Sequence, residues 1–520
     1  MQTFSGLNRR EFLKLISLAP LGIYSQPLSK VIQAASPKPN APAPGANVII
    51  IVFDAWSQHN VSLYGYPRPT MPNLERFAEN ATVYHNHYSA GTFTVPGTSS
   101  LLTGMYPWSH RAFQLGAGIS SRHVGHTLFS ALSSTHSTLA FTQNELADQI
   151  LQQLEVDLDR HVEIGLFDLQ NANLYTSPLF KNDTRIAFAG LNDNITRDRV
   201  GFDSSLFFGP LYRLRTLRAR ELGTQQYLDR YPHGLPESPG LFLLDDVVDG
   251  AIHLLQTIQQ PTLAYFHFLP PHDPYAPTEQ FFETFTDGWN PPDKPIHELS
   301  EHKASTRELH INRQYYDEFI ASWDHEVARL FQYLSESGLM ENSYVIVTAD
   351  HGEMFERGEL GHITKLIYDP LIRVPLVISR PGQTVREDVH TPTSSVDLLP
   401  TIAHLTGNPL PEWSEGKLLP RLGGDADEER SVFSMDAKFN SSFGPLVNYS
   451  MTLTRGHHRL TYYCYPKDNY QKYEFYDLDA DPEELNDLFT SSPTLALEMK
   501  DELLQRVESS NESFRREGQY

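Results

Sequence analysis

The chain contains five short, continuous apolar runs that are rich in β-branched and aromatic residues. Runs of this length, apolar on both faces, are typical of strands buried inside a parallel sheet. They cover Asn47–Phe53, Thr138–Phe141, Leu263–Leu269, Ser343–Thr348 and Val374–Ile378. The hydrophobic pattern therefore predicts a sheet of mostly parallel, buried strands.

Helical patterns lie between these runs. Apolar residues follow a period of about 3.6 residues there, as they do in helices that bury one face. The segments with this pattern are Met71–Glu79, Leu243–Ile258 and Gln314–Ser335. Strands that alternate with helices predict an α/β fold with a doubly wound, mostly parallel sheet, flanked by helices and joined by right-handed crossovers.

Polar residues follow several of the predicted strands. Asp54 comes after the first run, His272 after the third, and Asp350 and His351 after the fourth. Ligand sites in such sheets lie at the carboxyl ends of the strands, so these side chains are candidates for one site. Two carboxylates suit calcium, magnesium or manganese, and the imidazole shifts the preference toward manganese or zinc. An isolated Asp-His pair after a strand can also be a helix cap or a turn.

The segment Thr94–Gly104 predicts a loop that turns into a short helix. Thr94 stands at the start of this helix, where backbone N–H groups and the helix dipole would stabilise a deprotonated oxygen or a bound anion. A metal held by Asp54, Asp350 and His351 could lower the pKa of a coordinated Thr94 hydroxyl. The alternative is that Thr94 is an ordinary N-cap without chemistry.

Three further side chains could bind an anionic group: His272, His362 and Lys365. A histidine could also protonate a leaving group near neutral pH. Each of these residues alone is also compatible with a surface or core position. Their order behind the predicted strand ends favours a place in the site.

The N-terminal residues predict an export signal at 1–35. Arg9 and Arg10 precede Phe12-Leu13-Lys14 and a short apolar run, as in twin-arginine signals; the alternative is a fortuitous amphipathic helix. We expect an exported protein, periplasmic or extracellular, without a membrane span in the mature chain.

The remaining predicted units are a Pro-rich linker at 36–45, a catalytic domain at 46–408 with an insertion near the site at about 152–239, and a smaller C-terminal α+β subdomain at 428–520.

Composition narrows the range of partners. The chain has 64 acidic and 41 basic residues and a formal net charge of −23 at pH 7. A field of this sign disfavours nucleic acid as a partner, whereas a local pocket could still bind a small-molecule, glycan or lipid ester that carries an anionic group. Cys464 is the single cysteine, which excludes an intrachain disulfide and a zinc ribbon. The sequence leaves the oligomeric state open.

Seven segments match the motifs of one known family, in the family's order. They are N-V-I-I-I-V-F-D at 47–54, Y-G-Y-P-R-P-T-M-P-N-L at 64–74, S-L-L-T-G-M-Y-P at 100–107, T-A-D-H-G-E-M-F at 348–355, I-R-V-P-L-V-I at 372–378, V-D-L-L-P-T-I at 396–402 and E-F-Y-D-L-D-A-D-P-E-E-L-N-D-L at 474–488. Through them the chain resembles the sulfatase family of the alkaline-phosphatase superfamily over about residues 46–490. The resemblance implies one divalent metal ion on Asp54, Asp350 and His351, a nucleophile also on that metal, and anion contacts from His272, His362 and Lys365.

The chain departs from this family pattern at two points. Sulfatases carry Cys or Ser in C-x-P-S-R and oxidise it to formylglycine, whereas Thr94 and Thr98 stand at the nucleophile and arginine positions here. Threonine cannot form that aldehyde, and its hydroxyl is similar to the nucleophile of phosphodiesterases and of phosphoglycerol or phosphoethanolamine transferases in the same superfamily. Ala55 replaces a second aspartate, which implies a weaker or differently coordinated ion.

Three functions follow from these observations. The first is an exported, metal-dependent hydrolase or transferase of phosphate esters, phosphodiesters above all, that uses nucleophilic Thr94. The second is a sulfuric ester hydrolase that works without formylglycine. The third is a non-catalytic anion-binding protein, which would not need a metal beside a hydroxyl.

Overall fold

The computed structural model describes residues 45–169, 225–238, 240–491 and 493–517. The predicted export signal at 1–35, the linker up to residue 44 and most of the predicted insertion at 152–239 lie outside these residues. Within them, no helix is both long and apolar enough to cross a membrane.

An eight-stranded sheet forms the centre of the described chain. Its strand order is β11-β2-β10-β7-β1-β6-β4-β5, and β10 is its one antiparallel member, paired with β7 and β2. The predicted doubly wound, mostly parallel sheet is thus confirmed. The strands are β1 Asn47–Phe53, β2 Thr82–Tyr84, β4 Ser137–Thr142, β5 Arg160–His161, β6 Thr262–Phe268, β7 Ser343–Ala349, β10 Leu376–Ser379 and β11 Glu387–Val389.

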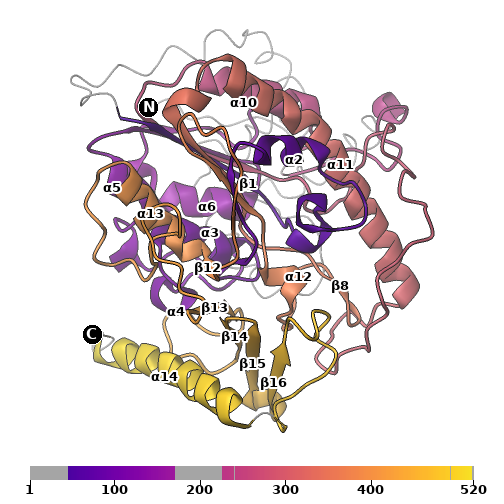
Figure 1. Cartoon of the computed structure of the whole chain (residues 1–520), viewed down its shortest axis with the longest axis vertical. Helices are drawn as coiled ribbons and strands as arrows, with labels where there is room; N and C mark the ends of the chain where they lie inside the picture. The colour runs from indigo at the N-terminus through magenta and orange to yellow at the C-terminus, as the bar shows by residue number, and fades with distance from the viewer. Residues whose placement is uncertain (1–44, 170–224, 239, 492, 518–520) are drawn as a thin grey trace, which may run out of the picture. The chain divides into compact units, whose positions relative to one another are not determined.

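Helices cover both faces of this sheet (Figure 1). Successive residues of a strand point to opposite faces, so Ile49 and Ile51 of β1 join one apolar core, whereas Ile50 and Val52 join another. The first core includes α2 Pro72–Ala78, α10 Leu244–Leu255 and α11 Thr306–Glu336. The second includes α3 Thr94–Thr103, α5 Leu128–Leu132, α6 Glu145–Gln153 and α13 Leu398–Leu405. Burial on both faces explains why the strands are continuous apolar runs.

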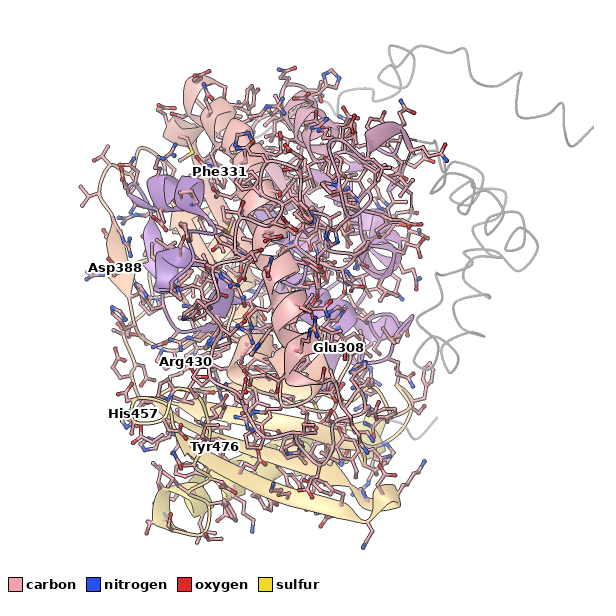
Figure 2. The ribbon with its side chains drawn as sticks, turned by 90° about the vertical axis from the view of Figure 1, so that its right-hand side faces the viewer. Glu308, Phe331, Asp388, Arg430, His457 and Tyr476 are labelled. Atoms are coloured by element: carbon pink, nitrogen blue, oxygen red, sulfur yellow. The ribbon has the colours of Figure 1, made fainter. Side chains whose placement is uncertain are left out.

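Several element boundaries differ from the predicted ones, and two of these differences have clear local reasons. Helix α11 begins at Thr306 instead of Gln314, because Ser305 caps it by accepting a hydrogen bond from the backbone of Glu308 at 3.3 Å. Most residues in its first turns are polar, so the period of apolar residues did not predict them. Figure 2 shows the helix between Glu308 and Phe331. Strand β10 begins after Pro375, which has no N–H to donate to a ladder.

A four-stranded antiparallel sheet, β13-β14-β15-β16, and helix α14 form the C-terminal part. Their bounds are β13 Ser431–Asp436, β14 Tyr449–Arg455, β15 His458–Tyr465, β16 Tyr470–Asp477 and α14 Pro493–Glu517. Met499 and Leu503 of α14 pack with Leu453 and Leu460 of the sheet. Shorter elements are β3 His87–Tyr88, α4 Pro107–His110, β8 Phe355–Glu356, β9 Glu359–Leu360, α12 Asp369–Ile372 and β12 Thr393–Ser394.

Candidate active site

Asp54 and Asp350 directly follow β1 and β7, which are parallel neighbours. The register pairs Phe53 with Ala349, so the two carboxylates leave the sheet side by side at its carboxyl edge. Alternation along each strand places both side chains on the face that α3 covers. Both residues are fully buried. The two strand ends therefore bring together the acidic residues that the sequence analysis singled out.

His351 lies between these carboxylates. Its Nε2 is 3.3 Å from Asp54 Oδ1 and 3.6 Å from Asp350 Oδ2. Its Nδ1 is 2.8 Å from the carbonyl oxygen of Gly352, which can only accept, so Nδ1 carries a hydrogen and a neutral His351 directs its Nε2 lone pair at the carboxylates. Burial lowers the pKa of His351, but Asp350 and Asp54 outweigh burial and raise the pKa to about 9.

Several buried polar atoms near His351 have no hydrogen-bond partner in the part of the chain that the structure describes. Asp54 Oδ1, Asp350 Oδ2 and His267 Nε2 are buried and have no hydrogen-bond partner among the described residues. Burial, and then the charge of Asp54, raise the pKa of Asp350, as expected for crowded carboxylates without a cation. Ligand atoms of Asp54, Asp350 and His351 all lie within 4.8 Å of one another. This donor set fits a divalent cation.

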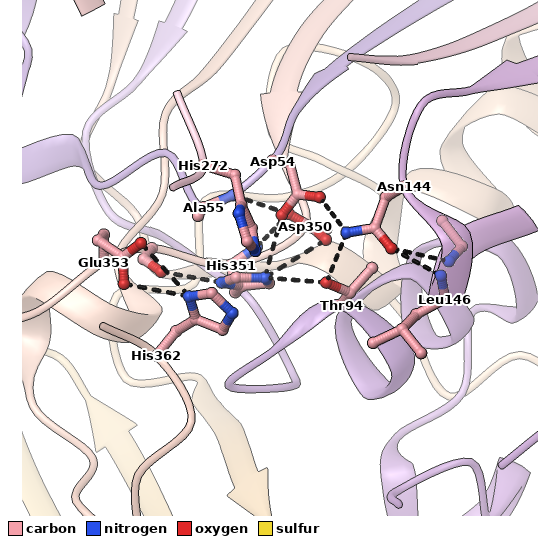
Figure 3. A network of polar contacts seen from close by, with 12 residues as sticks. Asp54, Ala55, Thr94, Asn144, Leu146, His272, Asp350, His351, Glu353 and His362 are labelled. Atoms are coloured by element: carbon pink, nitrogen blue, oxygen red, sulfur yellow. Dashed lines mark hydrogen bonds and ion pairs between the residues drawn. The ribbon is translucent and has the colours of Figure 1, made fainter. Parts of the chain in front are cut away.

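Thr94, the first residue of α3, faces this cluster (Figure 3). Its Oγ1 is 3.4 Å from His351 Nε2 and 3.4 Å from Asn144 Nδ2. The N-cap residue of α3 is Phe93, and no side chain caps the helix, so the capping alternative for Thr94 is wrong. Gly97 allows the close approach of α3, because a Cβ there would meet the backbone oxygen of Asp350 at 2.3 Å.

Asn144 belongs to the cluster although the sequence analysis did not identify it. As N-cap of α6, its Oδ1 accepts hydrogen bonds from the backbones of Leu146 at 2.8 Å and Ala147 at 3.3 Å. This fixes the amide so that Nδ2 donates to Asp54 Oδ2 at 2.6 Å and points at Thr94 (Figure 3). The available signal was an Asn between the predicted strand at 138–141 and a helix, at the carboxyl edge of the sheet.

His272 and His362 lie on the other side of His351 (Figure 3). The His362 ring centroid is 4.4 Å from that of His351 and 4.8 Å from that of His272. Burial lowers the pKa of His272, but Asp54, Asp273 and Glu353 raise it to about 9. Burial and the neighbouring histidines hold the pKa of His362 well below its ordinary value. His272 is the more exposed of the two, with 19% of its side chain accessible.

Glu353 supports this pair of histidines. Its Oε1 lies 3.1 Å from His362 Nδ1, and burial raises the pKa of Glu353 to about 7 against the effect of His272 and His351. A carboxylate at Nδ1 holds the ring in place and leaves Nε2 as its second polar atom. Glu353 was visible in the sequence only as part of the motif around Asp350.

Lys365 does not join the cluster. Its ammonium lies 3.1 Å from Glu301 and 3.5 Å from Asp468, and over the rings of Phe439 and Tyr465. None of these partners belongs to the cluster around His351, and the anion contact expected from Lys365 stays a prediction. The motif places a residue near this point of the chain, but a shift of one residue is enough to turn a side chain away.

Comparisons with known proteins agree with this fold. A family model described as Sulfatase matches residues 46–408, and a second model, described as N-sulphoglucosamine sulphohydrolase, C-terminal, matches residues 358–512. The choline-sulfatase of Rhizobium meliloti (strain 1021) is 22% identical over 444 residues, which cover 80% of this chain and 77% of the relative. The multifunctional alkaline phosphatase superfamily protein PehA of Trinickia caryophylli is 24% identical over 512 residues, which cover 88% and 93%.

A solved structure supports the same conclusion about the fold. The crystal structure of the phosphonate monoester hydrolase of Agrobacterium radiobacter matches with a TM-score of 0.65 at 17% sequence identity, over 90% of this chain and 96% of that chain. At this identity the likeness establishes a shared fold, and the chemistry has to be argued from the site.

Proposed function

The chain belongs to the sulfatase family and is an ester hydrolase, and we propose that the esters it cleaves are phosphate esters, phosphodiesters in particular, with Thr94 as nucleophile. The observation that carries this proposal is the place of the Thr94 hydroxyl, buried at the start of α3 and 3.4 Å from both His351 and Asn144. Threonine cannot become formylglycine, so the usual sulfatase nucleophile is excluded at this position. A relative described as multifunctional within the alkaline phosphatase superfamily is consistent with phosphate ester chemistry.

Three features favour attack by Thr94. A divalent cation held by Asp54, Asp350 and His351 would supply Lewis-acid polarisation of a substrate oxygen and a lower pKa for a hydroxyl beside it. The first turn of α3 adds backbone N–H groups and the positive end of the helix dipole. Asn144 Nδ2 can donate to an anionic oxygen at the same place, because its own carbonyl is held by α6.

The reaction then has two steps. Thr94 loses its proton to water, and its oxygen forms a bond to phosphorus while the bond from phosphorus to the leaving alcohol oxygen breaks. His272, whose pKa is raised by Asp54, Asp273 and Glu353 against the effect of burial, gives the proton to that oxygen. In the second step neutral His272 takes a proton from water, or from an acceptor alcohol in a transferase. The oxygen of that water or alcohol bonds to phosphorus while the bond from phosphorus to the Thr94 oxygen breaks, and Thr94 regains from solvent the proton that it lost in the first step. His362, held by Glu353, contacts the anionic substrate group.

A panel of matched 4-nitrophenyl esters tests this function: a sulfate, a phosphate monoester, a phosphodiester and a phosphonate monoester, each with added calcium, magnesium, manganese or zinc. We expect kcat/KM for the phosphodiester to exceed that for the sulfate at least tenfold, because the nucleophile is a hydroxyl and not a formylglycine hydrate. A preference for the sulfate would instead establish a sulfuric ester hydrolase without formylglycine. A purified protein that takes up no divalent ion and turns over no ester would favour an anion-binding protein.

We also propose that the chain is exported through the twin-arginine signal at 1–35. The support is the sequence Asn8-Arg9-Arg10-Glu11-Phe12-Leu13-Lys14 before an apolar run. Changing both Arg9 and Arg10 to Lys is expected to keep the protein in the producing cell's cytoplasm, whereas the parent chain leaves it. Equal export of the two chains, measured by cell fractionation, would contradict the proposal.

A further inference from the structure

His267 is a buried histidine whose Nε2 faces the two carboxylates of the site. It lies in β6 and is 0% exposed. Its Nε2 is 3.6 Å from Asp54 Oδ2 and 3.5 Å from Asp350 Oδ2, and has no hydrogen-bond partner among the described residues. A buried polar atom without a partner destabilises a protein by about 1–3 kcal/mol, so its position calls for a physical reason.

The strand register explains how His267 reaches this place. It pairs with Val52 of β1 and with Thr142 of β4. Residues two apart along β6 share a face, and Leu263 and Tyr265 of β6 lie in the apolar core that contains α3. The imidazole therefore lies on the same face of the sheet as Asp54 and Asp350, just below the carboxyl edge.

The distances favour a shared cation over hydrogen bonds. An N–H donor on Nε2 would approach a carboxylate oxygen to about 2.7–3.2 Å, and both separations here are longer. Two ligands of one cation lie about 3.0–3.4 Å apart when each bond to the cation is near 2.1 Å. His267 and His351 lie 3.5 Å and 3.6 Å from the same oxygen, Asp350 Oδ2, and they face different oxygens of Asp54, at 3.6 Å from Oδ2 and 3.3 Å from Oδ1. These separations lie close to this range.

The other ring nitrogen is held as metal-binding histidines usually are. Nδ1 of His267 lies 3.2 Å from Thr142 Oγ1, a hydroxyl that also accepts a hydrogen bond from the backbone N–H of Asn144 at 3.0 Å. When Nδ1–H donates to this hydroxyl, the Nε2 lone pair points at Asp54 and Asp350. Such outer partners fix both the tautomer and the ring orientation of a ligand histidine.

We propose that His267 is a fourth protein ligand of the cation, beside Asp54, Asp350 and His351. It supplies a donor at a site where Ala55 stands in place of a second aspartate. Two imidazoles and two carboxylates select a first-row transition ion such as zinc or manganese over calcium or magnesium, which prefer oxygen donors. This inference rests on the cation of the proposed function, but not on the ester that is cleaved.

Metal binding to the full chain tests the proposal, with His267→Gln as the variant and His87→Gln as the matched control. His87 is also fully buried and also contacts a threonine, Thr393, through Nδ1 at 3.0 Å, but it lies outside the carboxylate cluster. We expect His267→Gln to raise the Kd for zinc roughly 100-fold or more, since even outer partners of ligands contribute 10–100-fold. His87→Gln is expected to leave the Kd for zinc within about threefold of the parent value.

X-ray absorption of the zinc-loaded parent protein gives a measurement that does not depend on how a variant folds. Two imidazoles at the zinc ion are expected; one imidazole overturns the proposal, as does parent-like zinc affinity in a folded His267→Gln. If the imidazole count is two but no ester in the panel is hydrolysed, the ligand assignment stands and the proposed function fails. If esters are hydrolysed and the imidazole count is one, the proposed function stands and the ligand assignment fails.

Discussion

Thr94→Ala is expected to lower kcat on the preferred ester by at least about 10³-fold, because it removes the atom that would attack phosphorus and leaves the fold and the ligands Asp54, Asp350 and His351 in place. The Thr94 side chain is 1% exposed and small, so the change deletes one hydroxyl and one methyl group from a packed site. Thr94→Ser keeps the hydroxyl and is expected to retain much of the activity. Steady-state kinetics on the ester panel measure both effects.

The matched control for this change is Thr103→Ala, at the other end of the same helix. Thr103 is also buried, and its hydroxyl donates to the backbone oxygen of Ser99 at 2.7 Å, away from the cluster. We expect kcat to change less than about threefold there. A phosphoryl adduct on the peptide that contains Thr94, found by mass spectrometry when the second step is slowed, would establish the covalent step directly. Full activity of Thr94→Ala on every ester would exclude Thr94 as nucleophile.

Most of the candidate metal site could be predicted from the sequence because of one property of parallel sheets. Residues that follow neighbouring parallel strands meet at the same edge of the sheet. The apolar runs before Asp54 and Asp350 predicted two such strands, and the structure pairs them. The sequence did not supply strand order, but any order that places these two strands side by side gives the same site. Thr94 followed from its position at a helix start, which needs only local sequence.

Asn144 and His267 were not predictable in the same way. Asn144 does two things at once, since the cap of α6 uses its oxygen and the site uses its nitrogen. His267 lies within a strand and not after it, and a histidine inside an apolar run gives no sequence signal of a site. Its role depends on the pairing of β6 with β1, which the local sequence does not determine. The local motif around Lys365 likewise did not predict that its ammonium pairs with Glu301 and Asp468 from other segments.

The second large effect is expected from Asp350→Asn, which should abolish tight metal binding and lower kcat by at least about 10³-fold. Asn keeps one oxygen to accept from the backbone N–H of His351, as Asp350 Oδ1 does at 2.9 Å, but it removes the negative charge that faces the cation. A ligand at 100 times its Kd stabilises the folded state by about 2.7 kcal/mol. Zinc or manganese should therefore raise the Tm of the parent protein and leave that of Asp350→Asn unchanged.

In the presence of a chelator the order of stability is expected to reverse. Burial and Asp54 raise the pKa of Asp350, so without a cation its ionised form destabilises the fold. Such a group contributes stability below its unfolded pKa and loses this contribution as pH rises through the folded pKa, so the chelated parent should lose stability over that range while Asp350→Asn does not. Asp388→Asn, an exposed change beside Arg386, is the control for removing one charge. If Asp350→Asn gains as much stability from metal as the parent does, Asp350 is not a ligand, and the cluster at the ends of β1 and β7 would need another explanation for its unsatisfied atoms.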